Sequence, residues 1–188
     1  MDSPMGNDYV NIHQDLVDAC LAGDESAYSE LYKLYSKAMF NVALRIARDS
    51  DDAEDILQDA FVSAFTNLHS FSGKATFGAW LKRIVINKAI NHLKKQKANL
   101  VELSVDYELE DKVENEPDME FKVKTVQKAI QELPDGYRVV LSLYCLEGYD
   151  HKEIAQIMGI SESTSKTQYL RAKQKIVDLI GKERTYER

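Results

Sequence analysis

The side chains best suited to chemistry lie along one predicted helix, residues 77–97, which reads FGAWLKRIVINKAINHLKKQK and holds six basic residues and no acid. Polar residues at three- and four-residue steps share one face of it: Arg83, Asn87, Asn91 and Lys94. The opposite face is apolar and consists of Leu81, Val85, Ala89 and Leu93. The helix dipole favours lysines at a carboxyl end, but asparagine is an indifferent helix former. A face of cations and amides suits the phosphates and base edges of nucleic acid.

A second group of polar residues follows near the carboxyl end, where residues 146–176 predict two helices joined by a tight turn. Asp150 and Glu153 have the spacing of a capping box. Gly159 stands where a helix ends in a left-handed residue, and Ser161 is placed to cap the next helix. That second helix carries Lys166, Arg171, Lys173 and Lys175. The pattern predicts a helix-turn-helix, although pairs of amphipathic helices around a glycine also occur in proteins of other functions.

Clustered acids between residues 51 and 59 are the candidates for a metal site. Metal ligands must converge, whereas capping by Asp51 or Asp52 and the helix dipole account for most of these acids, so we expect no metal. The same predicted helix has a buried stripe of Leu57, Ala60, Phe61, Ala64, Phe65 and Leu68. Its exposed face carries Asp55, Gln58, Asp59 and Val62.

Composition excludes several classes of protein. Cys20 and Cys145 are isolated, which argues against a zinc site or disulfides and suits the reducing cytoplasm. No signal-peptide core and no run of 18 apolar residues is present, so we expect no membrane insertion. Because the sequence offers no nucleophile–base pair, metal cluster or phosphate loop, we expect neither an enzyme nor a cofactor.

The predicted fold is all-α, because apolar residues recur at helical spacing and no sustained alternation occurs. Between residues 24 and 47 a long helix carries aromatic residues that we assign to the core: Tyr28, Tyr32 and Tyr35. We predict an N-terminal helical bundle over residues 8–98 and a C-terminal helix-turn-helix domain over residues 119–182. Residues 99–118 hold one basic and eight acidic residues and predict a linker that is disordered when free.

The net charge of −7 hides an uneven distribution. Residues 1–98 hold 11 basic and 13 acidic residues, and residues 119–188 hold 12 and 10, so these parts carry −2 and +2. The excess of seven negative charges therefore lies in residues 99–118 alone. For binding to nucleic acid the local patch matters more than the sum.

The order of these motifs resembles bacterial RNA polymerase sigma factors of the sigma-70 family, in the small extracytoplasmic-function group. LAGDESAYSELYKLY resembles the start of the family's region 2, DDAEDILQDAF its polymerase-binding helix, and FGAWLKRIVINKAINHLKK its promoter-melting and −10 helix. LPDGYRVVLSLYCLEGYDHKEIAQIMGIS resembles region 4. The resemblance implies a factor that binds core RNA polymerase, recognises promoters and melts DNA so that transcription starts.

The resemblance also implies a role for individual residues. Contacts to the β′ clamp helices of polymerase fall on Asp55, Gln58 and Asp59. Contacts to the −10 element fall on Arg83, Asn87, Asn91, Lys94 and Lys95. A loop that captures a flipped base falls on Phe71, Ser72, Gly73 and Lys74. Phe77 and Trp80 lie in the melting region, although we expect most of the Trp80 surface to be core. The −35 element falls to Lys152, Ser163, Lys166, Thr167, Gln168, Arg171 and Lys173. Further implied partners are the β flap and an anti-sigma factor.

Three residues depart from the family pattern. Ser165 stands where most members have valine, which removes apolar area worth roughly 1–2 kcal/mol if the position is buried. Ser163 replaces a common glycine, and Gln168 a common arginine. These changes leave the predicted fold intact but weaken the inference about −35 contacts.

Two other functions fit parts of the pattern. A DNA-binding regulator with a helical dimerisation domain would bind duplex operators without polymerase. A metal-dependent nucleic-acid enzyme would lose its activity to a chelator and in an Asp55→Ala variant.

Overall fold

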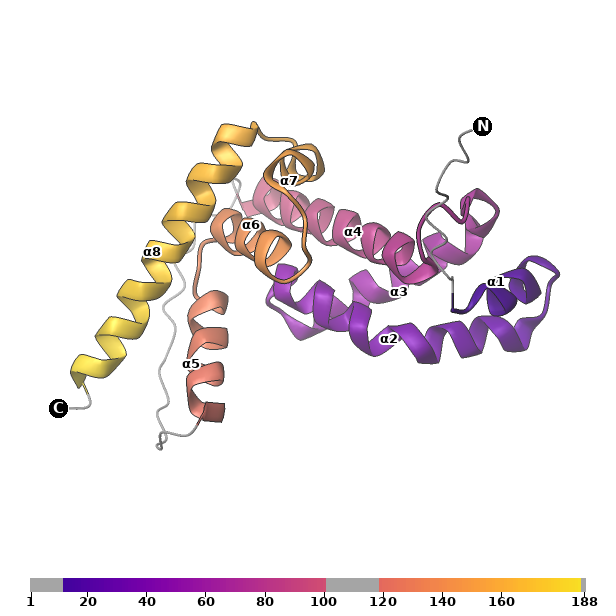
Figure 1. Cartoon of the computed structure of the whole chain (residues 1–188), viewed down its shortest axis with the longest axis horizontal. Coiled ribbons are helices and arrows are strands. Elements are labelled where there is room, and N and C mark those ends of the chain that lie inside the picture. The colour runs from indigo at the N-terminus through magenta and orange to yellow at the C-terminus, as the bar shows by residue number, and fades with distance from the viewer. Residues whose placement is uncertain (1–11, 101–118, 187–188) are drawn as a thin grey trace, which may run out of the picture. The chain divides into compact units, whose positions relative to one another are not determined.

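The computed structural model describes residues 12–100 and 119–186, and every regular element in these ranges is a helix (Figure 1). The all-α prediction is therefore confirmed. The chain divides into two compact units between Leu93 and Lys94. The last helix before the gap continues to Leu100, two residues into the segment predicted as linker, and residues 101–118 lie outside the described residues.

The N-terminal unit is built from helices of unequal length, namely α1 (Gln14–Leu21), α2 (Glu25–Ala47), α3 (Ser50–Thr66), the 3-10 turn η1 (Leu68–Ser70) and α4 (Phe77–Leu100) as far as Leu93. Asp24 caps α2, with its carboxylate accepting from the backbone N–H of Ser26 at 2.8 Å. The hydrogen bond from the Ser26 hydroxyl, together with this backbone one, holds the pKa of Asp24 below its usual value. Gly23, with φ +90°, makes the turn between α1 and α2.

The cap of α3 differs from the prediction of Asp51 or Asp52. The carboxylate of Asp49 accepts from the backbone N–H groups of Asp51 at 2.8 Å and Asp52 at 3.0 Å. A capping side chain must precede the free N–H groups that it satisfies, and Asp49 does so. Asp51 and Asp52 lie in the first turn, where the helix dipole favours their charge.

The core of the N-terminal unit lies where α2, α3 and α4 meet. The predicted apolar face of α4 is confirmed, because Leu81, Val85 and Ala89 are fully buried and Leu93 is nearly so. Aromatic rings connect the helices through edge contacts, with centroids 4.9 Å apart for Tyr28 and Phe65 and 5.3 Å for Tyr35 and Phe77. Phe65 is only half-buried, and Leu57, Ala60, Phe61, Ala64 and Leu68 form the rest of the predicted stripe as buried residues.

The C-terminal unit has α5 (Met119–Gln131), α6 (Asp135–Cys145), α7 (His151–Met158) and α8 (Glu162–Tyr186). Helices α5, α6 and α7 each pack against α8, whose Ala172 joins a small core with Leu133 and Leu141. The fully buried guanidinium of Arg138 fixes the α5–α6 corner, donating to the carbonyl of Leu133 at 3.1 Å and to the carboxylate of Asp135 at 2.8 Å.

The turn chemistry predicted for the helix-turn-helix is present in α7 and α8. Asp150 and Glu153 form the capping box, with hydrogen bonds of 2.8 and 2.9 Å. Gly159 ends α7 with φ +70°, in the left-handed region where a side chain would be strained. The hydroxyl of Ser161 accepts from the backbone N–H of Thr164 at 3.0 Å and so caps α8.

No helix within residues 12–100 and 119–186 is both long and apolar enough to cross a bilayer.

Candidate nucleic-acid interface

The exposed face of α4 is cationic and carries two amides. All five residues predicted for it are exposed, namely Arg83, Asn87, Asn91, Lys94 and Lys95. Two other polar residues of the helix, Lys88 and His92, are turned toward α3. Lys88 lies 4.0 Å from the carboxylate of Asp59, and His92 Nε2 lies 3.1 Å from the carboxylate of Asp52. One side of α4 thus packs within the protein, and its other side is exposed, where phosphates and base edges could bind.

The loop ahead of α4, residues 71–76, packs against the helix through its first residue and exposes its next three residues to solvent. Phe71 is half-buried, with its ring 5.4 Å from that of Trp80 and 5.9 Å from that of Phe77. Trp80 is half-buried too, whereas Phe77 is fully buried and belongs to the core. The next three residues, Ser72, Gly73 and Lys74, are exposed. Because Gly73 has φ +69° with no atom near its missing Cβ, backbone geometry explains the glycine.

Helix α8 presents most of its predicted DNA-facing residues to solvent. Exposed side chains are Ser163, Lys166, Thr167, Arg171 and Lys173, and Lys152 is exposed on α7. Gln168 is different, because its side chain is half-buried beside Gly136 and its Oε1 atom is buried with no hydrogen-bond partner. An ideal Cβ on Gly136 would lie 3.3 Å from that oxygen, so the glycine makes room for the Gln168 amide.

Three exposed side chains of α8 already have partners inside the protein. Lys166 Nζ lies 2.6 Å from the carboxylate of Glu162, one turn earlier, and this contact holds the pKa of Glu162 below its usual value. The Thr167 hydroxyl donates to the carbonyl of Ser163 at 2.9 Å. Lys173 Nζ lies 5.4 Å from the centre of the Tyr169 ring, at cation–π distance.

Ser165 is buried, and its hydroxyl is satisfied. Its Oγ lies 2.9 Å from His151 Nδ1. The imidazole of His151 stacks on Tyr144 with centroids 4.6 Å apart and meets Tyr169 edge-on at 5.6 Å. The structure therefore supplies a polar partner where the family pattern has an apolar side chain, and this hydrogen bond joins α7 to α8.

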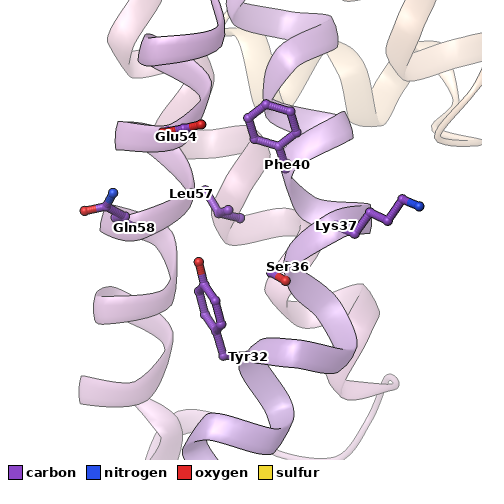
Figure 2. Close-up of a pocket in the computed structure, with 7 residues that line it drawn as sticks. All are labelled: Tyr32, Ser36, Lys37, Phe40, Glu54, Leu57 and Gln58. Atoms are coloured by element: carbon purple, nitrogen blue, oxygen red, sulfur yellow. The ribbon is translucent and has the colours of Figure 1, made fainter.

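The outer face of α3 and a neighbouring furrow form a further surface. Asp55, Gln58, Asp59 and Val62 are all exposed, Val62 by 65%. A furrow of about 430 Å³ runs between α2 and α3 and is lined by Tyr32, Ser36, Lys37, Phe40, Glu54, Leu57 and Gln58. Figure 2 shows Leu57 and the Tyr32 ring in the space between the helices, with Gln58 and Lys37 at opposite rims. Polar groups around an apolar floor are suited to holding a partner protein.

Tyr32 corrects the assignment of the α2 aromatics to the core. Tyr28 and Tyr35 are half-buried, but Tyr32 is 40% exposed and its ring, 4.7 Å from that of Phe61, lines the furrow. The exposure of Tyr32 could have been predicted from the sequence, because this residue makes the apolar stripe of α2 wider than one neighbouring helix can cover. The partnership of His151 with Ser165 was missed for another reason, since no helical spacing relates residues of two different helices.

The metal-ligating side chains and the two cysteines can be located in the described residues. Within residues 12–100 and 119–186 no three His, Cys, Asp or Glu side chains are grouped to hold a metal ion. Cys20 and Cys145 are free thiols, and burial raises the pKa of the Cys20 thiol.

Two family models and several known proteins match this chain. The family model "Sigma-70 region 2" matches residues 31–99, and "Sigma-70, region 4" matches residues 124–176. The ECF RNA polymerase sigma factor SigM of Mycobacterium tuberculosis (strain Erdman) is 31% identical over 94% of this chain and 88% of its own length. The RNA polymerase sigma-H factor of Pseudomonas aeruginosa is 31% identical over 87% of this chain and 91% of its own.

A similar fold occurs in the sigma factor RpoE of Bartonella quintana, which was solved in complex with the anti-sigma factor NepR. The TM-score is 0.58 at 22% identity, covering 82% of this chain and 96% of that one.

Proposed function

This chain belongs to the sigma-70 family of RNA polymerase sigma factors, in its extracytoplasmic-function group, and we propose which of its surfaces perform each part of that work. It binds core RNA polymerase, directs it to promoters and has no catalytic activity of its own. The observation that carries the proposal is the presence of two separate cationic helix faces in one chain, on α4 and on α8. Each face can contact a different promoter element.

Helix α8 contacts the −35 element in the major groove. Lys166 and Arg171 are the candidates for guanine O6 and N7, and Lys152 and Lys173 are placed better for phosphates. Ser163 and Thr167 lie on the exposed side of the same helix. Gln168 contacts an adenine only if its half-buried side chain turns outward, so we assign it a smaller share of the binding energy.

Helix α4 and the loop before it act on the −10 element. Asn87 and Asn91 face the bases, and Arg83, Lys94 and Lys95 neutralise phosphates. The open part of the loop, Ser72 to Lys74, receives a base that leaves the duplex. Unstacking a base costs a few kcal/mol, which contacts in the loop must offset for the duplex to melt. The half-buried Phe71 and Trp80 rings hold the loop against α4.

Polymerase binds the outer face of α3. Asp55, Gln58 and Asp59 provide the polar contacts to the β′ clamp helices, and the furrow beside Gln58 accepts apolar side chains around Tyr32. In the C-terminal unit, Tyr144 and Leu146 are 40% and 53% exposed at the carboxyl end of α6 and are the candidates for the β flap.

Regulation and location follow from the family. Because a structural neighbour was solved with an anti-sigma factor, we expect an anti-sigma partner that covers polymerase-binding or DNA-binding surfaces here as well. The chain works in the cytoplasm, where polymerase and promoter are found.

A pull-down with core polymerase followed by run-off transcription tests this division of labour. Asp59→Ala should weaken polymerase binding, and Asp55→Ala should do the same without disturbing the contact between Asp59 and Lys88. Lys166→Ala should leave polymerase binding intact and reduce transcription from promoters that depend on the −35 element. If the Asp59 and Lys166 variants lose both activities together, the assignment of separate surfaces is wrong.

A further inference from the structure

We infer that Leu170 reads one base pair of the −35 element by packing on the C5-methyl group of a thymine. The inference rests on the proposed role of α8 as the recognition helix. Leu170 is 64% exposed, although it is a large apolar side chain within the cationic stretch of that helix. An explanation for its exposure must come from its position and from its neighbours.

Leu170 points away from the protein core. The inner side of α8 is marked by the packed or buried side chains of Ser165, Tyr169, Ala172 and Ile176. At about 100° per residue, Leu170 lies about 130° from the middle of that side. Lys166 lies about 40° to one side of it and Thr167 about 60° to the other, one turn earlier. A helix that places Lys166 and Thr167 in the major groove therefore places Leu170 there too.

The polar groups around Leu170 are largely engaged within the protein. Lys166 is paired with Glu162 at 2.6 Å. Thr167 donates its hydroxyl hydrogen to the carbonyl of Ser163, so its methyl group is left for an outside partner. Gln168 is half-buried beside Gly136. What the centre of this face offers to DNA is thus apolar, namely Leu170 and the Thr167 methyl.

Thymine is the base that matches such a surface. In the major groove it presents a methyl group beside its O4 acceptor, and apolar side chains discriminate it by contact with that methyl. The cations Arg171 and Lys173 flank the apolar centre and suit phosphates and guanines on either side. The chemistry therefore points to a T·A pair opposite the middle of α8.

Isolated apolar side chains are common on protein surfaces, and α8 contains a matched example. Val177 is also 64% exposed and lies seven residues after Leu170. It is about 10 Å further along the helix axis, beyond the turns that enter the groove. Val177 therefore serves as the control for exposure without base contact.

The test uses the full chain assembled with core polymerase. A −35 sequence is first selected from a randomised duplex library, and each thymine in it is then replaced by deoxyuridine, which removes only the methyl group. At one position we expect the wild-type holoenzyme to lose about fourfold in affinity, the value of burying one methyl group. The Leu170→Ala holoenzyme should bind both duplexes equally, and the Val177→Ala holoenzyme should keep the fourfold difference.

Several outcomes would overturn the inference. Equal deoxyuridine penalties in the wild-type and Leu170→Ala proteins at every thymine would show that Leu170 reads no methyl. Loss of core polymerase binding in Leu170→Ala would assign the side chain to a protein contact instead. If the wild-type holoenzyme selects no −35 sequence at all, the proposed role of α8 fails together with the inference. Selection without methyl dependence would refute the inference alone.

Discussion

At the scale of single residues, hydrogen-bond partners decide whether an unusual side chain is tolerated. Ser165 was expected to weaken the core because it replaces an apolar residue, but its hydroxyl is paired with His151 at 2.9 Å. A buried hydroxyl without a partner would cost more than the apolar area it displaces, whereas a paired one is close to neutral. The substitution of the family's apolar residue thus depends on His151, a residue 14 positions earlier.

The contribution of this pair is measurable in urea. Ser165→Ala removes the hydrogen bond and leaves His151 Nδ1 to water, so we expect the free energy of unfolding to fall by about 1 kcal/mol. Ser163→Ala, an exposed change on the same helix, should stay within about 0.5 kcal/mol of the wild type. Equal effects of the two changes would mean that the His151 contact does not stabilise the fold.

A second residue-scale prediction concerns the pair of Glu162 with Lys166. Glu162→Gln removes the carboxylate that holds Lys166, so the lysine becomes available to DNA. We expect the holoenzyme to bind a −35 duplex about threefold more tightly at low salt, with the gain shrinking as salt screens the charges.

The control for this gain is Asp178→Asn, which removes one negative charge from the same helix three turns beyond Lys166. Asp178 lies far from Lys166 along the helix, and its carboxylate accepts from the Gln174 amide at 3.0 Å. If both variants gain equally, net charge explains the effect and release of Lys166 does not.

At the scale of elements, the close approach of two helices restricts which residue can stand at the contact, and the sequence of one helix alone does not show this. In α4, a Cβ on Gly78 would lie 2.7 Å from a ring carbon of Tyr35 in α2. The Tyr35 ring cannot easily move, because its hydroxyl is 2.8 Å from His13 Nδ1 and the ring packs on Phe77. Burial also raises the pKa of Tyr35, consistent with its enclosed position.

Gly78→Ala should therefore lower the free energy of unfolding by about 2 kcal/mol through overpacking. In a Tyr35→Ala background the same change should be neutral or stabilising by up to about 1 kcal/mol, because alanine is the better helix former. Thermal or urea unfolding of the four proteins completes this cycle. A cost that persists without the Tyr35 ring would show that the steric explanation is wrong.

Sequence patterns predicted the helices well and their surroundings less well. Spacing and capping residues located the apolar face of α4 and the turn at Gly159, because both depend on residues close in sequence. The spacing of apolar residues does not show how much of the α2 surface neighbouring helices cover. Tyr32 was therefore assigned to the core, although it lines a furrow. The inward turn of Gln168 toward Gly136 likewise depends on a neighbouring helix. The orientation of the side chains proposed for the −35 element was therefore the least predictable part of the candidate site.

At the scale of the whole molecule, the distribution of charge affects sequence-independent DNA binding and promoter binding differently. The parts on either side of residues 99–118 carry −2 and +2, and that segment carries −7. Long-range repulsion from an acidic chain weakens sequence-independent binding to DNA, which is mostly electrostatic. In the arrangement we propose, contacts to polymerase and to promoter bases depend instead on local groups of α3, α4 and α8. The free protein should therefore bind random DNA poorly while the holoenzyme binds promoters.

Replacing the eight acids of residues 99–118 by their amides tests this view, since it changes the net charge from −7 to +1. We expect the free variant to bind a random duplex about tenfold more tightly than the wild type near 50 mM salt, with the difference fading at higher salt. A variant with the same 20 positions in scrambled order keeps all its charge and should bind like the wild type. If the neutralised protein gains nothing at low salt, long-range charge does not limit DNA binding by the free factor, and the weak binding must arise from its surfaces being covered.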